Sequence, residues 1–204
     1  VFWFWANGTF SNPIGTSSAD QTYVNFLWAD YNPCAGSNGQ IYLLVGDENS
    51  LVALNVKLFT FDIATGSVTS VLVDNSMYTI SSIHAWPEGD CKNLYSVSPG
   101  LVTDGPENRV WNLVSVDPAS GDVFNPVAIS QAGEFTQYYG GAVYGKSVNT
   151  LNQMAHLFKR EIDSSFEVKL INLQTRSTDS TASVNLGVNS LLSLSTLVYS
   201  PPKQ

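Results

Sequence analysis

A short pattern recurs along this chain at a fixed spacing, and it limits the folds that the chain can adopt. An apolar stretch runs into Asp-x-x-Thr/Ser-Gly at Asp62 and again at Asp117, which lie 55 positions apart. The same spacing reaches Asn172 in one direction and Asn7 in the other, and each follows an apolar stretch. A chain with such a repeat folds as several similar units packed against one another.

The residues of the repeat predict a tight turn between two strands. An Asp or Asn side chain accepts hydrogen bonds from backbone amides two or three residues later, and these bonds close the bend. Glycine at Gly66 and Gly121 supplies a positive φ at low cost. The third copy has Arg176 at the equivalent position, so its turn is expected to be weaker.

Each repeat contains four short stretches rich in aromatic and β-branched residues, separated by Gly, Pro, Asn and Asp, which is typical of strands and turns. These sets occupy residues 23–73, 78–129 and 138–184. The helical candidate 149–160 is assigned to a strand, because its position in the repeat is that of a strand. The predicted strands are Tyr23–Trp28, Ile41–Val45, Leu58–Phe61, Ser67–Val73, Tyr78–Trp86, Leu94–Val97, Val110–Val116, Asp122–Ile129, Gln137–Tyr144, Met154–Phe158, Phe166–Ile171 and Ser177–Val184.

Four strands in each period of about 50–55 residues are the unit of a β-propeller blade. The fourth set is split, with two strands in residues 188–200 and two in residues 1–16. Pairing of the two chain ends closes the ring and protects the sheet edges. We therefore predict an all-β single domain, a four-bladed β-propeller closed by a composite blade. A β-sandwich or irregular barrel is the alternative, as is a fragment of a longer propeller.

The strand-Asp-x-x-Thr/Ser-Gly hairpin resembles the turn between the outer strands of kelch-like and quinoprotein-like propeller repeats. The resemblance covers nearly the whole chain, and it concerns an architecture rather than one family. The tryptophan that ends the quinoprotein repeat is missing, so the resemblance implies no quinone cofactor, and we predict no cofactor.

The charge of the chain excludes several classes of partner. There are 17 acidic and 9 basic residues, a net charge of −8, and no basic cluster to neutralise phosphates, so nucleic-acid binding is excluded. No apolar run reaches the length of a membrane-spanning helix, and membrane insertion is not expected. Only 13 % of the residues are charged, while Ser, Thr, Asn and Gly are plentiful. We predict a secreted, extracellular protein, and the start at Val1 suits a processed N-terminus or an excised fragment.

Two features fit a secretory route. Cys34 and Cys91 lie 57 positions apart, near one repeat period, and should meet at one end of neighbouring blades. We predict a disulfide between them, worth about 4 kcal/mol in the chain-entropy model; the alternative is two free thiols. Asn7 begins the one Asn-x-Ser/Thr triplet of the chain, on a predicted turn, and is the predicted glycosylation site.

Acidic residues recur in the loops between the second and third strands, which share one face of a propeller. They are Asp47, Glu48, Asp104, Glu107, Glu161 and Asp163. Asp74 and Glu134, in the connections between blades, are expected on the same face. Carboxylates in such numbers suit Ca²⁺ or a basic partner, and a solvated rim is the alternative. No Asp-x-Asp/Asn-x-Asp/Asn-Gly calcium loop occurs, so no metal site is assigned.

The common sequence motifs of enzymes are absent. There is no G-x-S-x-G, no H-E-x-x-H, no phosphate-binding loop and no G-x-G-x-x-G. His84 and His156 are expected to be hydrogen-bonded structural residues rather than metal ligands. The large tryptophans are expected to pack between blades.

We therefore expect a non-catalytic extracellular propeller that serves as a structural or binding module with protein or glycan partners. One alternative is a self-associating subunit of an extracellular filament or matrix assembly. Another is a hydrolase or lyase with its site at the central channel. That function needs polar residues facing inward on the first strands, whereas Tyr23–Trp28 and Leu191–Leu194 are mostly apolar.

Overall fold

The computed structural model describes residues 23–47, 55–86, 89–100, 105–143 and 152–184. These residues form three four-stranded antiparallel sheets and one 3₁₀ turn, η1 (Pro106–Asn108). The first sheet contains β1 (Tyr23–Asn32), β2 (Gln40–Asp47), β3 (Val56–Asp62) and β4 (Val68–Leu72). The second contains β5 (His84–Trp86), β6 (Asp90–Ser98), β7 (Asn112–Val116) and β8 (Val123–Ala128). The third contains β9 (Phe135–Val143), β10 (Gln153–Arg160), β11 (Phe166–Asn172) and β12 (Ser177–Val184).

The all-β prediction is confirmed, and all twelve predicted strands have a counterpart in sequence order. β10 is a strand, as its position in the repeat predicted. β5 is much shorter than the predicted strand at residues 78–86. Its first part, with Ile80 and Ile83 fully buried, folds into the core without strand pairing. In the described part of the chain, no helix is long and apolar enough to cross a membrane.

The repeated turns form as the residue pattern predicts. In the first copy, the Asp62 carboxylate accepts hydrogen bonds from the backbone N–H and the hydroxyl of Thr65, both at 2.9 Å. In the third copy, the Asn172 side chain accepts the backbone N–H of Thr175 at 3.0 Å. Arg176 adopts a φ of 56°, close to the 68° of Gly66. The third turn therefore keeps the shape of the others without glycine.

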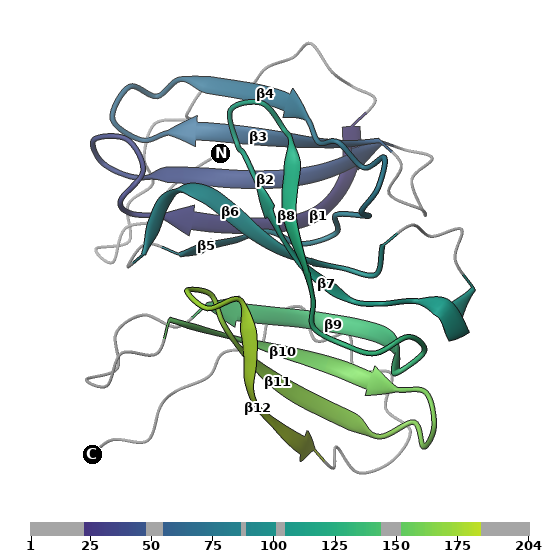
Figure 1. The fold of residues 1–204 in the computed structure, drawn as a ribbon. Helices are drawn as coiled ribbons and strands as arrows, with labels where there is room; N and C mark the ends of the chain where they lie inside the picture. The colour runs from purple at the N-terminus through teal and green to yellow at the C-terminus, as the bar shows by residue number, and fades with distance from the viewer. Residues whose placement is uncertain (1–22, 48–54, 87–88, 101–104, 144–151, 185–204) are drawn as a thin grey trace, which may run out of the picture.

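The second sheet lies between the other two (Figure 1), and most residues of its strands β6 and β7 are buried. Toward the first sheet, Leu94 and Val114 pack against Leu44 and Leu58. Toward the third sheet, Val97 packs in a cluster with residues such as Met154 and Phe158. Apolar residues alternate along β6 between the two neighbours, because successive side chains of a strand point to opposite faces.

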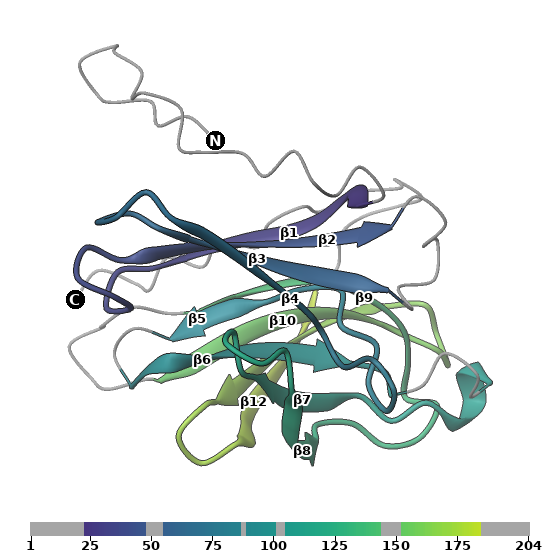
Figure 2. The same ribbon diagram turned by 90° about the horizontal axis from the view of Figure 1, so that it is seen from above.

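The first strands of the three sheets lie next to one another, with β5 in contact with both β1 and β9. Seen from above in Figure 2, β1 and β2 form one layer and β5 and β9 run beneath it. The described residues do not form the predicted four-bladed ring, because they contain three sheets rather than four and no sheet closes. The strands of the predicted composite blade, in residues 1–16 and 188–200, lie outside the described residues.

Each later turn docks against the preceding sheet. The Asp74 backbone N–H, just after β4, donates to the Gly121 carbonyl at 2.9 Å. A Cβ on Gly121 would lie 1.9 Å from the Leu72 carbonyl oxygen, so only glycine fits there. Arg176 reaches the second sheet, where its guanidinium donates to the Ser115 hydroxyl at 2.9 Å.

Candidate functional site

Four ring-bearing side chains meet where the first strands converge, and we call them the axial cluster: Trp28, His84, Tyr138 and His156. Trp28 of β1 contacts His84 of β5 edge-to-face, with ring centroids 5.1 Å apart. Tyr138 of β9 stacks at a tilt against His156 of β10, at 5.5 Å. The cluster therefore joins all three sheets at one point near the axis on which their first strands meet.

The Tyr138 hydroxyl links the two histidines. It lies 3.1 Å from Nδ1 of His156 and 3.4 Å from Nε2 of His84. A hydroxyl can donate one hydrogen bond and accept another, so it can serve both rings when one ring nitrogen is protonated and the other is not. The Nε2 atom of His156 is buried and has no hydrogen-bond partner. The predicted role of both histidines as hydrogen-bonded core residues is confirmed.

Burial keeps the cluster uncharged at neutral pH. It lowers the pKa of His84 to about 3, because a charged imidazolium would lose its hydration there. Burial, and to a lesser extent the neighbouring His84, lowers the pKa of His156 well below its usual value. Burial also raises the pKa of Tyr138. Neutral imidazoles can accept a proton, but His84 and His156 are only 2 % and 0 % exposed, so they present no surface to a substrate.

Sequence reasoning missed Tyr138, although the sequence held a signal for it. Trp28, His84 and Tyr138 occupy nearly equivalent positions of the repeat, spaced by 56 and 54 residues. Equivalent positions on the first strands of successive sheets should meet near one axis, as these three do. His156 comes from a second strand, and its spacing alone could not place it in the cluster.

A carboxylate beside the axial cluster accepts a hydrogen bond from the backbone. Asp30, two residues after Trp28, accepts the backbone N–H of Ala85 at 2.8 Å and so joins β1 to β5. Burial raises the pKa of Asp30, an effect that this hydrogen bond partly offsets. Among the described residues, no group of three or more His, Cys, Asp or Glu side chains is arranged to hold a metal ion.

The described acidic loops of the second and third sheets lie at one end of the molecule. Glu107 on η1 is exposed, as are Glu161 and Asp163 in the β10–β11 turn. The β8–β9 connection joins them: the Glu161 backbone N–H donates to the Glu134 carbonyl at 3.1 Å, and a Cβ on Gly133 would lie 2.7 Å from the Glu107 carbonyl. Asp47 ends β2, while Glu48 and Asp104 lie outside the described residues.

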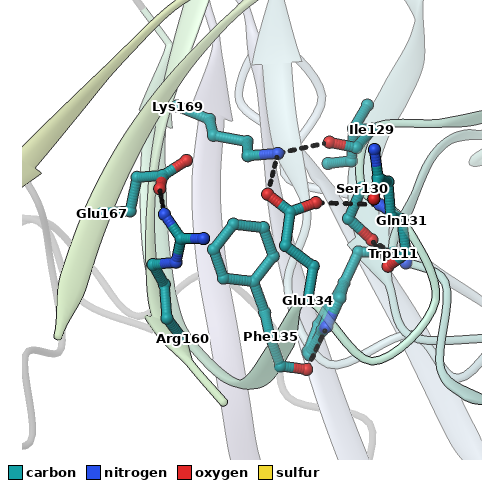
Figure 3. A network of polar contacts seen from close by, with 9 residues as sticks. All are labelled: Trp111, Ile129, Ser130, Gln131, Glu134, Phe135, Arg160, Glu167 and Lys169. Carbon is teal, nitrogen blue, oxygen red and sulfur yellow. Dashed lines mark hydrogen bonds and ion pairs between the residues drawn. The ribbon is translucent and has the colours of Figure 1, made fainter. Parts of the chain in front are cut away.

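Glu134 lies beside these loops, and its carboxylate pairs with a lysine (Figure 3). The Lys169 ammonium lies 3.1 Å from a Glu134 carboxylate oxygen and donates to the Ile129 carbonyl at 2.9 Å. It also lies 4.6 Å from the centre of the Phe135 ring. Lys169 is 6 % exposed, and loss of Glu134 would leave a buried ammonium without its carboxylate. The pair therefore holds the second sheet to the third.

The predicted disulfide is present. Cys34 lies in the β1–β2 loop and Cys91 at the start of β6, and their Cα atoms are 5.4 Å apart. Buried Asn32 supports both ends, because its side chain accepts the Cys34 backbone N–H at 3.2 Å and donates to the Cys91 carbonyl at 3.3 Å. The bond ties the first sheet to the second. The predicted glycosylation site, Asn7, lies outside the described residues.

No family model matches the chain, and no curated protein matches its sequence.

Proposed function

We propose that this chain is a non-catalytic extracellular module that presents its loops to a partner on a rigid four-bladed β-propeller. The three described sheets would be blades 23–73, 78–129 and 138–184. Residues 1–16 with 188–200 would form the composite fourth blade. The 55-residue repeat, the convergence of the first strands and the docking of each later turn on the preceding sheet support this arrangement.

One observation carries the choice of a module over an enzyme. The two histidines at the axis are buried between the sheets, and the neutral His84–Tyr138–His156 contacts hold those sheets together. The accessible chemistry that we propose therefore lies in the loops, which is where a binding scaffold carries its function. A hydrolase or lyase at the channel needs accessible acid–base groups near the axis, and His84 and His156 are enclosed there.

Secretion is supported by the Cys34–Cys91 bond, because disulfides persist mainly in oxidising compartments. In the secretory route of a eukaryote, Asn7 would carry a glycan on its predicted turn. No cofactor is required by a function of this kind.

The partner surface that we favour is the acidic loop end, which includes the exposed Glu107, Glu161 and Asp163. Asp47, Glu48 and Asp104 are the other acidic residues that the sequence predicts for this surface. Carboxylates gathered at one end of an acidic protein attract a basic protein surface and speed its approach. Glycan binding and self-association into a filament or matrix are the alternative forms of the same module.

The test combines mass and binding on the unreduced full chain. Size-exclusion chromatography with light scattering should give a monomer near 22.1 kDa, apart from glycan. A fluorescent decalysine peptide should bind, and the double variant Glu161→Gln, Asp163→Asn should weaken binding several-fold. The matched control Asp122→Asn removes an exposed carboxylate from the β7–β8 turn and should leave binding unchanged. Equal losses in both variants would show attraction to net charge alone and refute the acidic end as the site.

A further inference from the structure

The first sheet has an apolar face that is turned away from the second sheet. Tyr42, Leu44 and Leu58 point toward the second sheet and are buried there. Their neighbours along each strand point the other way, and the strand register places them side by side. This outer face consists of Phe26, Ala29, Tyr31, Ile41, Leu43, Val45, Lys57, Phe59, Phe61, Val68, Ser70 and Leu72.

The outer face is open at its two edge strands. Phe26 is 65 % exposed, Leu72 59 % and Tyr31 43 %, whereas Phe61 is buried and the other apolar residues that β2 and β3 contribute to this face are half-buried. Lys57 extends its ammonium over the Phe59 ring, 5.8 Å from the ring centre, and Ser70 is the other polar residue of the face. Neighbouring apolar side chains exposed in this way commonly mark a surface that another element or partner covers.

The turn of the first sheet also lacks the contact that the equivalent turns make. A Cβ on Gly121 would strike the first sheet, and Arg176 in the third turn binds the second sheet. A Cβ on Gly66 would meet no atom within 4 Å. Within the described residues, the first sheet therefore has no preceding sheet on its outer face or at its turn.

The segment before β1 contains the apolar residues needed to cover the outer face of the first sheet. Twenty-two residues precede Tyr23, and they begin Val-Phe-Trp-Phe-Trp. In a strand, Phe2 and Phe4 would point to one side and Trp3 and Trp5 to the other, as suits a strand packed between two apolar sheets. The six residues 17–22, which would connect residue 16 to β1, can span up to about 20 Å.

We propose that residues 1–16 of the same chain dock on the outer face of the first sheet and reach the Asp62–Gly66 turn. This inference rests on the proposed four-bladed fold and names the surface that receives the composite blade. It also identifies a joint without a disulfide. The Cys34–Cys91 bond ties the first sheet to the second, and the Lys169 contacts tie the second to the third. Both cysteines are used, so the joint at Phe26 has no disulfide.

Photo-cross-linking on the full-length chain tests the docking. Phe26 is replaced by p-benzoylphenylalanine, the protein is irradiated, and the linked peptides are identified by mass spectrometry. We expect a link from position 26 to residues 1–16 within one chain, at the monomer mass. The same replacement at Tyr31 is a second reporter on the face. Ile162, 84 % exposed in the third sheet's turn, is the matched control and should give no link to residues 1–16.

Three outcomes would overturn the inference, and they separate it from the proposed function. Links between two copies would place a second chain on the face, while the acidic-end binding could still hold. Links to residues 188–200 with none to residues 1–16 would show that the other terminal segment docks on this face. The docking of residues 1–16 would then be wrong, while the composite blade could still form. No link from either reporter, in a protein with an unchanged near-ultraviolet circular dichroism spectrum, would reject the docking, and the peptide-binding test at the acidic end would still decide the proposed function by itself.

Discussion

Acidification should destabilise this protein before its carboxylates titrate, because its two histidines are buried in uncharged form. His84 and His156 are the two histidines of the chain, so the effect has a defined origin. Burial lowers the pKa of His84 from 6.5 to about 3, and it lowers the pKa of His156 well below 6.5. Below pH 6.5 the unfolded chain therefore takes up protons that the folded chain does not, and stability falls as the pH falls.

The magnitude can be worked out for His84, whose pKa falls from 6.5 to about 3. Each pH unit below 6.5 should lower the free energy of unfolding by about 1.4 kcal/mol for this histidine. At pH 5.0 its loss is about 2 kcal/mol, and His156, whose pKa is also lowered, adds to the loss in the same direction. Asp30, whose pKa is raised by burial, contributes in the opposite direction, and its effect begins only as the pH approaches the range of carboxyl groups.

Urea unfolding of the unreduced protein between pH 7.5 and 5.0 measures this slope. Each single variant, His84→Phe or His156→Phe, should lose part of the slope, and the double variant should lose nearly all of it. The slope is the readout, so a lower overall stability of a variant does not obscure the result. A wild-type free energy of unfolding that stays constant between pH 6.5 and 5.0 would refute the buried, neutral state of the histidines.

Three further predictions concern the joints between sheets. Reduction of the Cys34–Cys91 bond should lower the free energy of unfolding by about 4 kcal/mol, measured by urea unfolding with and without reductant. Gly66→Ala should lower the free energy of unfolding by about 1–2 kcal/mol through backbone strain. Gly121→Ala should lower it clearly more, because the added Cβ strikes the first sheet. Equal losses in the two variants would contradict this contact. Arg176→Ala should be less stable than Arg176→Gly by about 1 kcal/mol, because only the first keeps the strain of a positive φ.

The strands and turns were predictable because local chemistry determines them. The Asp62 and Asp117 turns depend on side chains that bond to amides within three residues, and such contacts can be seen in sequence. The extent of β5 was predicted wrongly for the opposite reason. Ile80 and Ile83 have the composition of a strand, but tertiary packing buries them in an irregular segment, where Ile80 donates its N–H to the Asn75 side chain at 3.4 Å.

The polar contacts between sheets were less predictable, because each joins residues far apart in the chain. Glu134 lies in a connection that sequence reasoning assigned to an open acidic face, and its partner Lys169 is 35 positions away. The axial cluster was partly visible, since Trp28, His84 and Tyr138 follow the repeat spacing. The disulfide was predicted from the same spacing, because one repeat period brings equivalent loops of neighbouring sheets together.

Arg176 shows how a departure from the repeat becomes a structural contact. A residue other than glycine at positive φ costs about 1–2 kcal/mol. The guanidinium offsets this cost, since it donates to the Ser115 hydroxyl at 2.9 Å, to the Leu113 carbonyl at 3.2 Å and to the Asn125 carbonyl. Hydrogen bonds from a charged group contribute about 1.5–3 kcal/mol each. Glycine could form the turn but could not make these bonds. Arginine in place of glycine at this position of the third copy therefore connects the third sheet to the second.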